Sequence, residues 1–134
     1  MTAHPIVLAS RSPRRRQLLE MLGLPVIVAA ADVQEIRLPR ESPSAYARRL
    51  ARDKARAVPG ALVLGADTIV VVDDDVLEKP EDAEHALAML RRLQGRRHDV
   101  VTSVCLIAGG TVQEAQDVTA VYFRPADDAM LRAY

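Results

Sequence analysis

Four arginines and two serines lie where the first helix of this chain is expected to begin. The stretch LASRSPRRRQLLEML, residues 8–22, holds Ser10, Ser12, Arg14 and Arg15 between an apolar run and a helical pattern. The N-terminus of a helix exposes unpaired backbone N–H groups and a partial positive charge, so it attracts anions. Arginines at this end of a helix oppose its dipole and cost stability. Their presence here therefore favours a turn that binds phosphate. A solvated helix start in an arginine-rich chain is the alternative.

A carboxylate interrupts the most apolar stretch of the chain. Asp67, in GADT at 65–68, separates Leu-Val-Leu from Ile-Val-Val-Val. A buried carboxylate is costly unless it is paired or binds a metal, so Asp67 is a candidate metal ligand or general base. An aspartate that ends one strand and caps a turn is the alternative. Glu35, a carboxylate in an expected loop, is unremarkable alone.

Lysine is rare in this chain, which draws attention to each of its positions. Of the 18 basic residues, 16 are arginine and only Lys54 and Lys79 are lysine. Lysine is a compact point charge whereas arginine is a planar fork, so a retained lysine marks a candidate site that arginine cannot fill. Chance retention is the alternative. The lone Cys105 is expected in the core, His4 and His85 are expected to be incidental, and a zinc site is not expected.

Strands and helices alternate along the chain and would position these residues. Apolar runs predict strands at 5–10, 25–30, 61–72 (interrupted at Gly65), 76–80, 98–108 and 111–123, with a hairpin turn at 109–110. Capping signals predict helices at 12–22, 42–58 and 81–95 and a last one from residue 124. Leu18, Leu19 and Leu22 form the expected apolar stripe of the first helix. The expected buried face of the second carries Tyr46, Leu50, Ala57 and Val58.

Length and composition fit one α/β domain over 1–134. The chain has 134 residues, of which 49% are hydrophobic, and its acidic and basic residues balance at 18 each. That balance, with no Trp and few other aromatic rings, argues against an arginine-driven nucleic-acid binder. No apolar run reaches the ~20 residues of a membrane span, and no signal peptide is evident. We therefore expect a cytoplasmic protein without membrane or nucleic-acid partners.

Five stretches taken together resemble the Maf family of nucleoside triphosphate pyrophosphatases. They are LASRSPRRRQLL at 8–19, RLARDKA at 49–55, GADT at 65–68, EKP at 78–80 and MLRRLQGRRHDVVT at 89–102. Their order and spacing agree across nearly the whole chain. The resemblance implies a Maf/ITPase-like mixed sheet flanked by helices. It also implies metal-assisted attack of water on the α-phosphorus of a nucleoside triphosphate, giving the monophosphate and pyrophosphate.

The resemblance implies a role for each candidate residue. The substrate-binding residues would be Ser10, Ser12, Arg14, Arg15, Lys54, Thr68 and Lys79. Glu35 and Asp67 would hold a divalent metal cation, Mg²⁺ or Mn²⁺, and Asp67 would also accept the proton of the attacking water. The two lysines would neutralise charge that redistributes on the phosphates. Arg11 and Arg16 are left to solvent.

Substrate and assembly follow from the same resemblance. Arg14 and Thr68 match the branch that is similar to dTTP/UTP pyrophosphatases, so dTTP, UTP and modified pyrimidine nucleotides are the expected substrates. Dimers are known in the family, so a homodimer is allowed. Family members continue beyond the helix that begins near Asp127, so we expect a chain lacking the family's C-terminal strands and helix. A truncated nucleotide- or phosphate-binding module, weak or inactive as an enzyme, is the alternative function.

Overall fold

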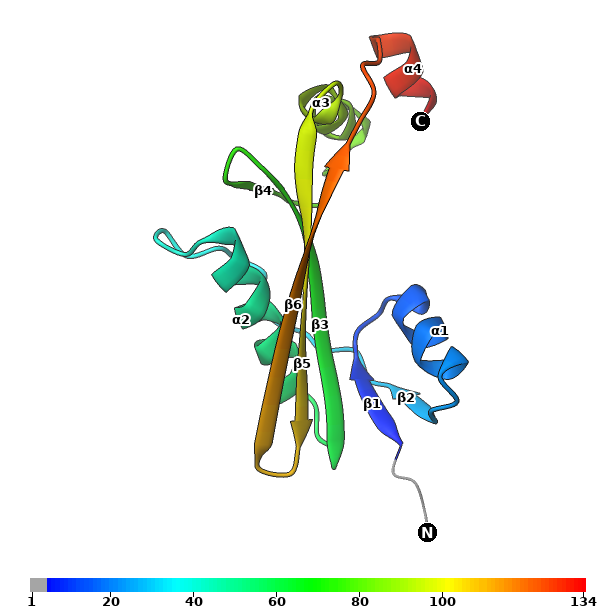
Figure 1. Cartoon of the computed structure of the whole chain (residues 1–134), viewed down its shortest axis with the longest axis vertical. Coiled ribbons are helices and arrows are strands. Elements are labelled where there is room, and N and C mark those ends of the chain that lie inside the picture. Colours follow the sequence, from blue (N-terminus) through cyan, green and yellow to red (C-terminus); the bar gives the residue numbers. More distant parts are fainter. Residues whose placement is uncertain (1–4) are drawn as a thin grey trace.

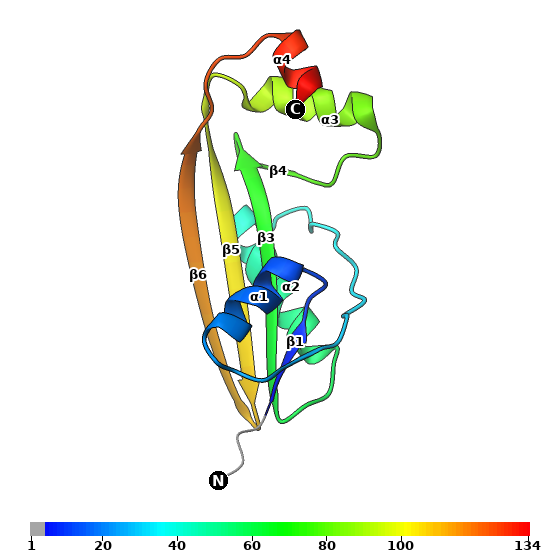
Figure 2. The same ribbon diagram turned by 90° about the vertical axis from the view of Figure 1, so that its right-hand side faces the viewer.

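A twisted mixed sheet runs the length of the molecule, and the computed structural model describes residues 5–134 of it (Figures 1 and 2). The strands lie in the order β2 (Val26–Val28), β1 (Ile6–Ala9), β3 (Leu62–Val72), β5 (Arg97–Ala108), β6 (Thr111–Tyr122). β1 pairs in parallel with both β2 and β3. β5 pairs antiparallel with β3 and β6, and β4 (Asp75–Leu77) pairs antiparallel with β3. The predicted α/β class is confirmed. His4 lies outside the described residues.

Gly65 does not interrupt β3, which corrects the sequence-based prediction. β3 is continuous over eleven residues, and Gly65 pairs with Ala9 on one side and Cys105 on the other. A Cβ at Gly65 would lie 2.6 Å from the Ala55 backbone nitrogen of the helix that crosses the strand. The absent side chain therefore lets a helix backbone approach the strand closely.

Helix α1 (Pro13–Met21) has the predicted ends but not the predicted buried stripe. Ser12 caps it, Pro13 occupies its first turn, and Gly23 follows with φ +78°. However, α1 buries none of its residues, and Leu18 and Leu22 are 56% and 73% exposed. The reason is the position of α1. It contacts only the short strand β2 to any extent and lies on the opposite face of the sheet from α2 (Pro43–Arg56) (Figure 1).

Helix α2 (Pro43–Arg56) supplies the main packing against the sheet. Ser42 caps it, and its buried face lies on β3 and β5, with these residues buried: Pro43, Tyr46, Ala47, Leu50, Ala51 and Ala55. The predicted contribution of Ala57 is wrong, because the helix ends at Arg56 and Ala57 is its exposed cap. Small residues on this face let α2 lie close to Gly65, which brings the polar residues of α2 over the middle of β3.

The far end of the long β5–β6 hairpin carries α3 (Ala83–Leu93) and α4 (Asp128–Ala133) (Figure 2). Asp82 caps α3, and Arg91 holds Asp128 of α4 at 2.7 Å. His98, the second residue of β5, is buried, with its ring 4.7 Å from that of Phe123. Cys105 is fully buried in the core, as predicted. Within residues 5–134 no helix is long and apolar enough to cross a membrane.

Candidate active site

The turn between β1 and α1 is closed by its own serines. Ser10 Oγ accepts a hydrogen bond from the Ser12 backbone at 3.2 Å, and Ser12 Oγ caps the helix by accepting from the Arg15 backbone at 3.4 Å. Ser10 is buried because it follows β1 directly into the sheet. Both serines therefore stabilise the turn, independently of any ligand that binds there.

Arg15 reaches from this turn across the sheet to β3. Its guanidinium donates to Ser10 Oγ at 3.0 Å, to the Ala66 carbonyl at 3.4 Å and to Thr68 Oγ1 at 2.8 Å. Burial lowers the pKa of Arg15, and the nearby Asp67 carboxylate opposes that shift. All three acceptors are neutral, so the cation is held in place without a counterion in hydrogen-bond contact. Such a group is suited to an anionic ligand.

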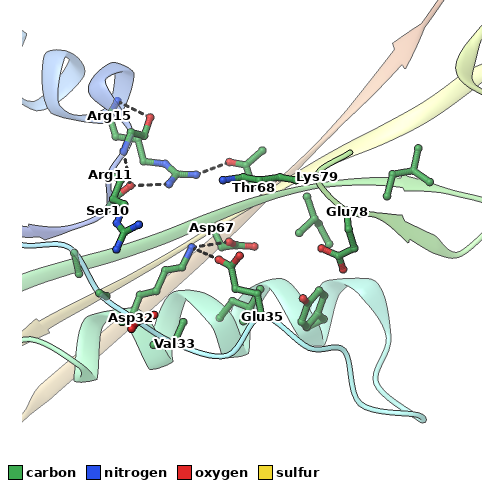
Figure 3. Close-up of a pocket in the computed structure, with 18 residues that line it drawn as sticks. Ser10, Arg11, Arg15, Asp32, Val33, Glu35, Asp67, Thr68, Glu78 and Lys79 are labelled. Carbon is green, nitrogen blue, oxygen red and sulfur yellow. Dashed lines mark hydrogen bonds and ion pairs between the residues drawn. The ribbon is translucent and has the colours of Figure 1, made fainter. Parts of the chain in front are cut away.

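Lys54 joins two carboxylates on the α2 side of β3 (Figure 3). Its Nζ lies 2.9 Å from Glu35 Oε1 and 2.9 Å from Asp67 Oδ1. Burial lowers the pKa of Lys54, but the hydrogen bonds to Glu35 and Asp67 together outweigh it, so that pKa is raised. Burial raises the pKa of Asp67, and Lys54 only partly offsets this. Asp67 is thus a proton acceptor stronger than an ordinary aspartate.

Asp67 lies in the middle of β3, which excludes the alternative that it ends a strand and caps a turn. It pairs with Ser103 of β5, is 6% exposed, and its Oδ2 is buried without a partner in residues 5–134. Buried polar atoms without a partner cost free energy. Asp67 Oδ2 is therefore a position at which a ligand would gain a hydrogen bond or a metal contact.

A tyrosine and a second glutamate lie farther along the same space. Burial raises the pKa of Tyr46 to about 12, with Glu78, Asp67 and Glu35 contributing to the same shift. Tyr46 is fully buried, and its hydroxyl lacks a hydrogen-bond partner among the described residues. Burial also raises the pKa of Glu78. Carboxylates therefore crowd this end of the site, which favours a cationic partner.

These groups line one cavity of about 480 Å³ between the β1–α1 turn, β3 and α2. The predicted site residues that line it are Ser10, Ser12, Arg15, Glu35, Lys54, Asp67, Thr68 and Lys79. They come from five separate stretches of the chain. The fold thus places a cationic turn across from a buried carboxylate, an arrangement that can hold phosphates beside a proton acceptor.

Comparison with known proteins places this geometry in a family. Residues 5–134 match the family described as Maf-like protein. The chain belongs to the Maf family. The dTTP/UTP pyrophosphatase of Anaeromyxobacter dehalogenans is 50% identical over 133 residues, covering 96% of this chain and 69% of that protein. The dTTP/UTP pyrophosphatase of Escherichia coli is 45% identical over 134 residues, covering 96% of this chain and 68% of that protein.

A solved structure supports the Maf fold at lower similarity. The Ham1 protein of Staphylococcus aureus matches with a TM-score of 0.56 and 15% identity, covering 87% of this chain and 70% of that one. At this identity the likeness concerns the fold alone. It agrees with the mixed sheet and flanking helices of the Maf chain.

Two carboxylates of the Maf cavity have the oxygen-donor chemistry that a divalent cation prefers. Glu35 and Asp67 converge on the same Lys54 ammonium, and Asp67 keeps a buried oxygen without a partner. Mg²⁺ is commonly bound by one or two carboxylates together with substrate phosphates and water. Among residues 5–134, no group of three or more His, Cys, Asp or Glu side chains is placed to hold an ion unaided.

The arginines of the turn are arranged differently from the sequence-based expectation. Arg15 lines the cavity and Arg16 pairs with Glu20 on the exposed helix face, as expected. Arg11 is exposed, as expected, but it also lines the cavity, whereas Arg14 is exposed and does not line it. Residue 11 precedes the helix cap, so helical periodicity does not decide where its side chain points.

Three polar residues of the Maf site were not anticipated from sequence. Tyr46 was assigned to the core, which its 0% exposure confirms, and it also lines the cavity. Glu78 lines the cavity beside Lys79. Thr102 contacts Thr68 because the two residues are register partners in β3 and β5. Thr102 ends the motif at 89–102, but only the strand register shows that it meets Thr68.

Proposed function

We propose that this Maf chain hydrolyses nucleoside triphosphates to the nucleoside monophosphate and pyrophosphate, with dTTP, UTP and modified pyrimidine nucleotides as substrates. One observation carries the proposal: a desolvated arginine without a counterion shares a cavity with a buried carboxylate whose second oxygen has no partner. The curated relatives named dTTP/UTP pyrophosphatase support the reaction and the choice of pyrimidine nucleotides.

The phosphate chain would lie along the β1–α1 turn. Arg15 presents a rigid guanidinium there, since three neutral oxygens hold it. Lys79 lines the same cavity and would complete the charge compensation. Hydrolysis of a phosphoanhydride requires little from the protein beyond positioning and charge stabilisation. This arrangement supplies both.

Asp67 would accept a proton from the attacking water. The water oxygen bonds to the α-phosphorus, the bond from that phosphorus to the bridging oxygen breaks, and pyrophosphate leaves with the electron pair. The raised pKa of Asp67 makes the carboxylate a better base for this step. Lys54 would hold Asp67 and Glu35 in place through its two ion pairs.

A divalent cation, Mg²⁺ or Mn²⁺, would be held by Glu35 and Asp67 together with phosphate oxygens. When bound, it would supply neutralisation of phosphate charge. The buried unpartnered oxygen of Asp67 supports this assignment.

The proposal is tested by pyrophosphate release from dTTP or UTP with Mg²⁺ or Mn²⁺. Asp67→Asn is expected to lower turnover by about 10²–10⁴-fold, the usual contribution of a general base, while nucleotide affinity stays within a few-fold. Asp53→Asn is a matched control, since Asp53 lies on α2 outside the cavity lining and pairs with Arg49 at 3.4 Å.

Two results would contradict the proposal. A folded wild-type chain that binds nucleotide yet releases no pyrophosphate with either metal is a binding module. An Asp67→Asn chain that no longer unfolds cooperatively shows that Asp67 has a structural role.

A further inference from the structure

Arg11 is the one residue of the turn 10–12 whose side chain has no hydrogen-bond or ion-pair partner among residues 5–134. Ser10 and Ser12 are both engaged within the turn. Arg11 lines the cavity, and Figure 3 shows its side chain extending from the same turn as Ser10. A long cationic side chain at this place is therefore available to a ligand.

Arg11 balances the charge of the cavity lining. Four cations line it against four carboxylates: Arg11, Arg15, Lys54 and Lys79, and Asp32, Glu35, Asp67 and Glu78. Lys54 is already shared between Glu35 and Asp67. Without Arg11 the lining would carry a net negative charge, which opposes the approach of any polyanion.

We propose that Arg11 binds the phosphate chain as a second guanidinium beside Arg15. The inference rests on the proposed function, because it assigns a subsite within the same cavity. Arg15 is fixed by three neutral acceptors, whereas Arg11 keeps its donors free. Arginine binds phosphate oxygens through paired hydrogen bonds. Because Arg11 is exposed and makes no hydrogen bond or ion pair with Asp67, its contact contributes to substrate binding rather than to the chemical step.

Calorimetric titration of the whole chain with inorganic tripolyphosphate tests this contact without requiring turnover. Arg11→Gln is expected to weaken binding about tenfold, the lower range for a hydrogen bond to a charged group. Arg11→Lys, which keeps the charge, is expected to recover part of the loss. Arg16→Gln makes the same charge change on the neighbouring exposed helix face, where Arg16 pairs only with Glu20, and is expected to leave affinity within twofold.

Steady-state kinetics with dTTP provide the second readout. KM is expected to rise in Arg11→Gln by the same factor as the tripolyphosphate affinity falls, with kcat within about twofold. Equal losses in Arg11→Gln and Arg16→Gln would overturn the inference, since the effect would then be one of overall charge. An unchanged tripolyphosphate affinity in Arg11→Gln would also overturn the inference, as would a wild-type chain that does not bind tripolyphosphate.

The two proposals fail in different ways. A wild-type chain that binds tripolyphosphate through Arg11 but releases no pyrophosphate refutes the proposed function and leaves the phosphate subsite in place. A chain that turns over dTTP normally after Arg11→Gln refutes the subsite and leaves the function in place.

Discussion

Neutral oxygens hold the Arg15 guanidinium in the position where a phosphate would meet it. Thr68 Oγ1 accepts from Arg15 at 2.8 Å and lies 3.1 Å from Thr102 Oγ1. A threonine hydroxyl carries one hydrogen, so while Thr68 accepts from Arg15 it can donate that hydrogen to Thr102. Thr102 thereby orients the lone pairs of Thr68 towards Arg15, which makes Thr102 a positioning residue.

Removing the Thr102 hydroxyl should weaken substrate binding. Thr102→Val leaves the Thr68 hydroxyl without its acceptor, at a cost of about 1 kcal/mol, or roughly a fivefold rise in KM for dTTP. Since Arg15 binds rather than reacts, kcat should change less than KM. Steady-state pyrophosphate release measures both constants. Thr102→Ser keeps the hydroxyl and should restore KM; a serine variant as weak as the valine variant would contradict the hydrogen-bond explanation.

The N–H groups of the first helical turn are less available than the sequence suggested. Pro13 has no N–H group, the Arg15 N–H caps onto Ser12 Oγ, and the Arg16 N–H bonds the Ser12 carbonyl at 3.3 Å. The Arg14 N–H remains for an anion. Arginine side chains must therefore provide most of the attraction that the helix terminus alone was expected to supply.

Local signals predicted the boundaries of the elements well. Ser12 with Pro13, and Ser42 with the proline after it, mark helix starts that the structure confirms. These signals work because a cap involves only residues within one turn. The exposure of Leu18 and the cavity position of Arg11 depend on which strand lies beside α1, and no local pattern encodes that.

Likewise, GADT and RLARDKA indicated Asp67 and Lys54 separately. Their 2.9 Å contact arises from the close approach of α2 to β3 at Gly65. The sequence identifies the chemistry of the residues, and the packing decides which of them meet.

The closeness of α2 to β3 is itself testable. In Gly65→Ala the new methyl group would collide with the backbone at Ala51 and Ala55, so α2 must shift outward. We expect a loss of about 1–3 kcal/mol in the free energy of unfolding, as for other overpacked sites, and reduced activity because Lys54 moves with the helix. Urea denaturation and pyrophosphate release measure the two effects.

Gly110→Ala is the matched control for this change. No atom lies within 4 Å of a Cβ at Gly110, and its φ is not in the left-handed region. Its unfolding free energy should stay within about 0.5 kcal/mol of wild type. Similar stability of the two alanine variants would show that Gly65 is not needed for the approach of α2.

At the scale of the whole molecule, charge is concentrated locally although the total is balanced. The chain has 18 basic and 18 acidic residues. Many of the arginines are used in pairs that tie elements together, such as Arg52 with Glu114 at 2.7 Å and Arg91 with Asp128 at 2.7 Å. Three cations that form no ion pair within residues 5–134 line one cavity: Arg11, Arg15 and Lys79. Such a distribution suits a small polyanion better than an extended nucleic acid.

The stability of the whole fold should depend on pH through His98. Burial lowers the pKa of His98, and Asp99 only partly offsets this. The unfolded chain therefore binds a proton at the ordinary histidine value of about 6.5, where the folded chain does not. Stability is full above that pH and falls as the pH drops towards the lowered pKa of the folded state. The raised pKa values of Asp67 and Glu78 act in the opposite direction, so the effect of His98 is isolated by comparing variants.

Urea midpoints measured from pH 8 to pH 5 provide that comparison. In the wild type, His98 should lower the urea midpoint as the pH falls. His98→Gln should remove this contribution, because a glutamine does not titrate. His85→Gln is the matched control: His85 lies on α3 and is only half-buried, with Nδ1 accepting from the Glu81 backbone. The control should follow the wild-type profile. If His98→Gln follows the same profile as well, the buried His98 imidazole does not cause the loss of stability at acid pH.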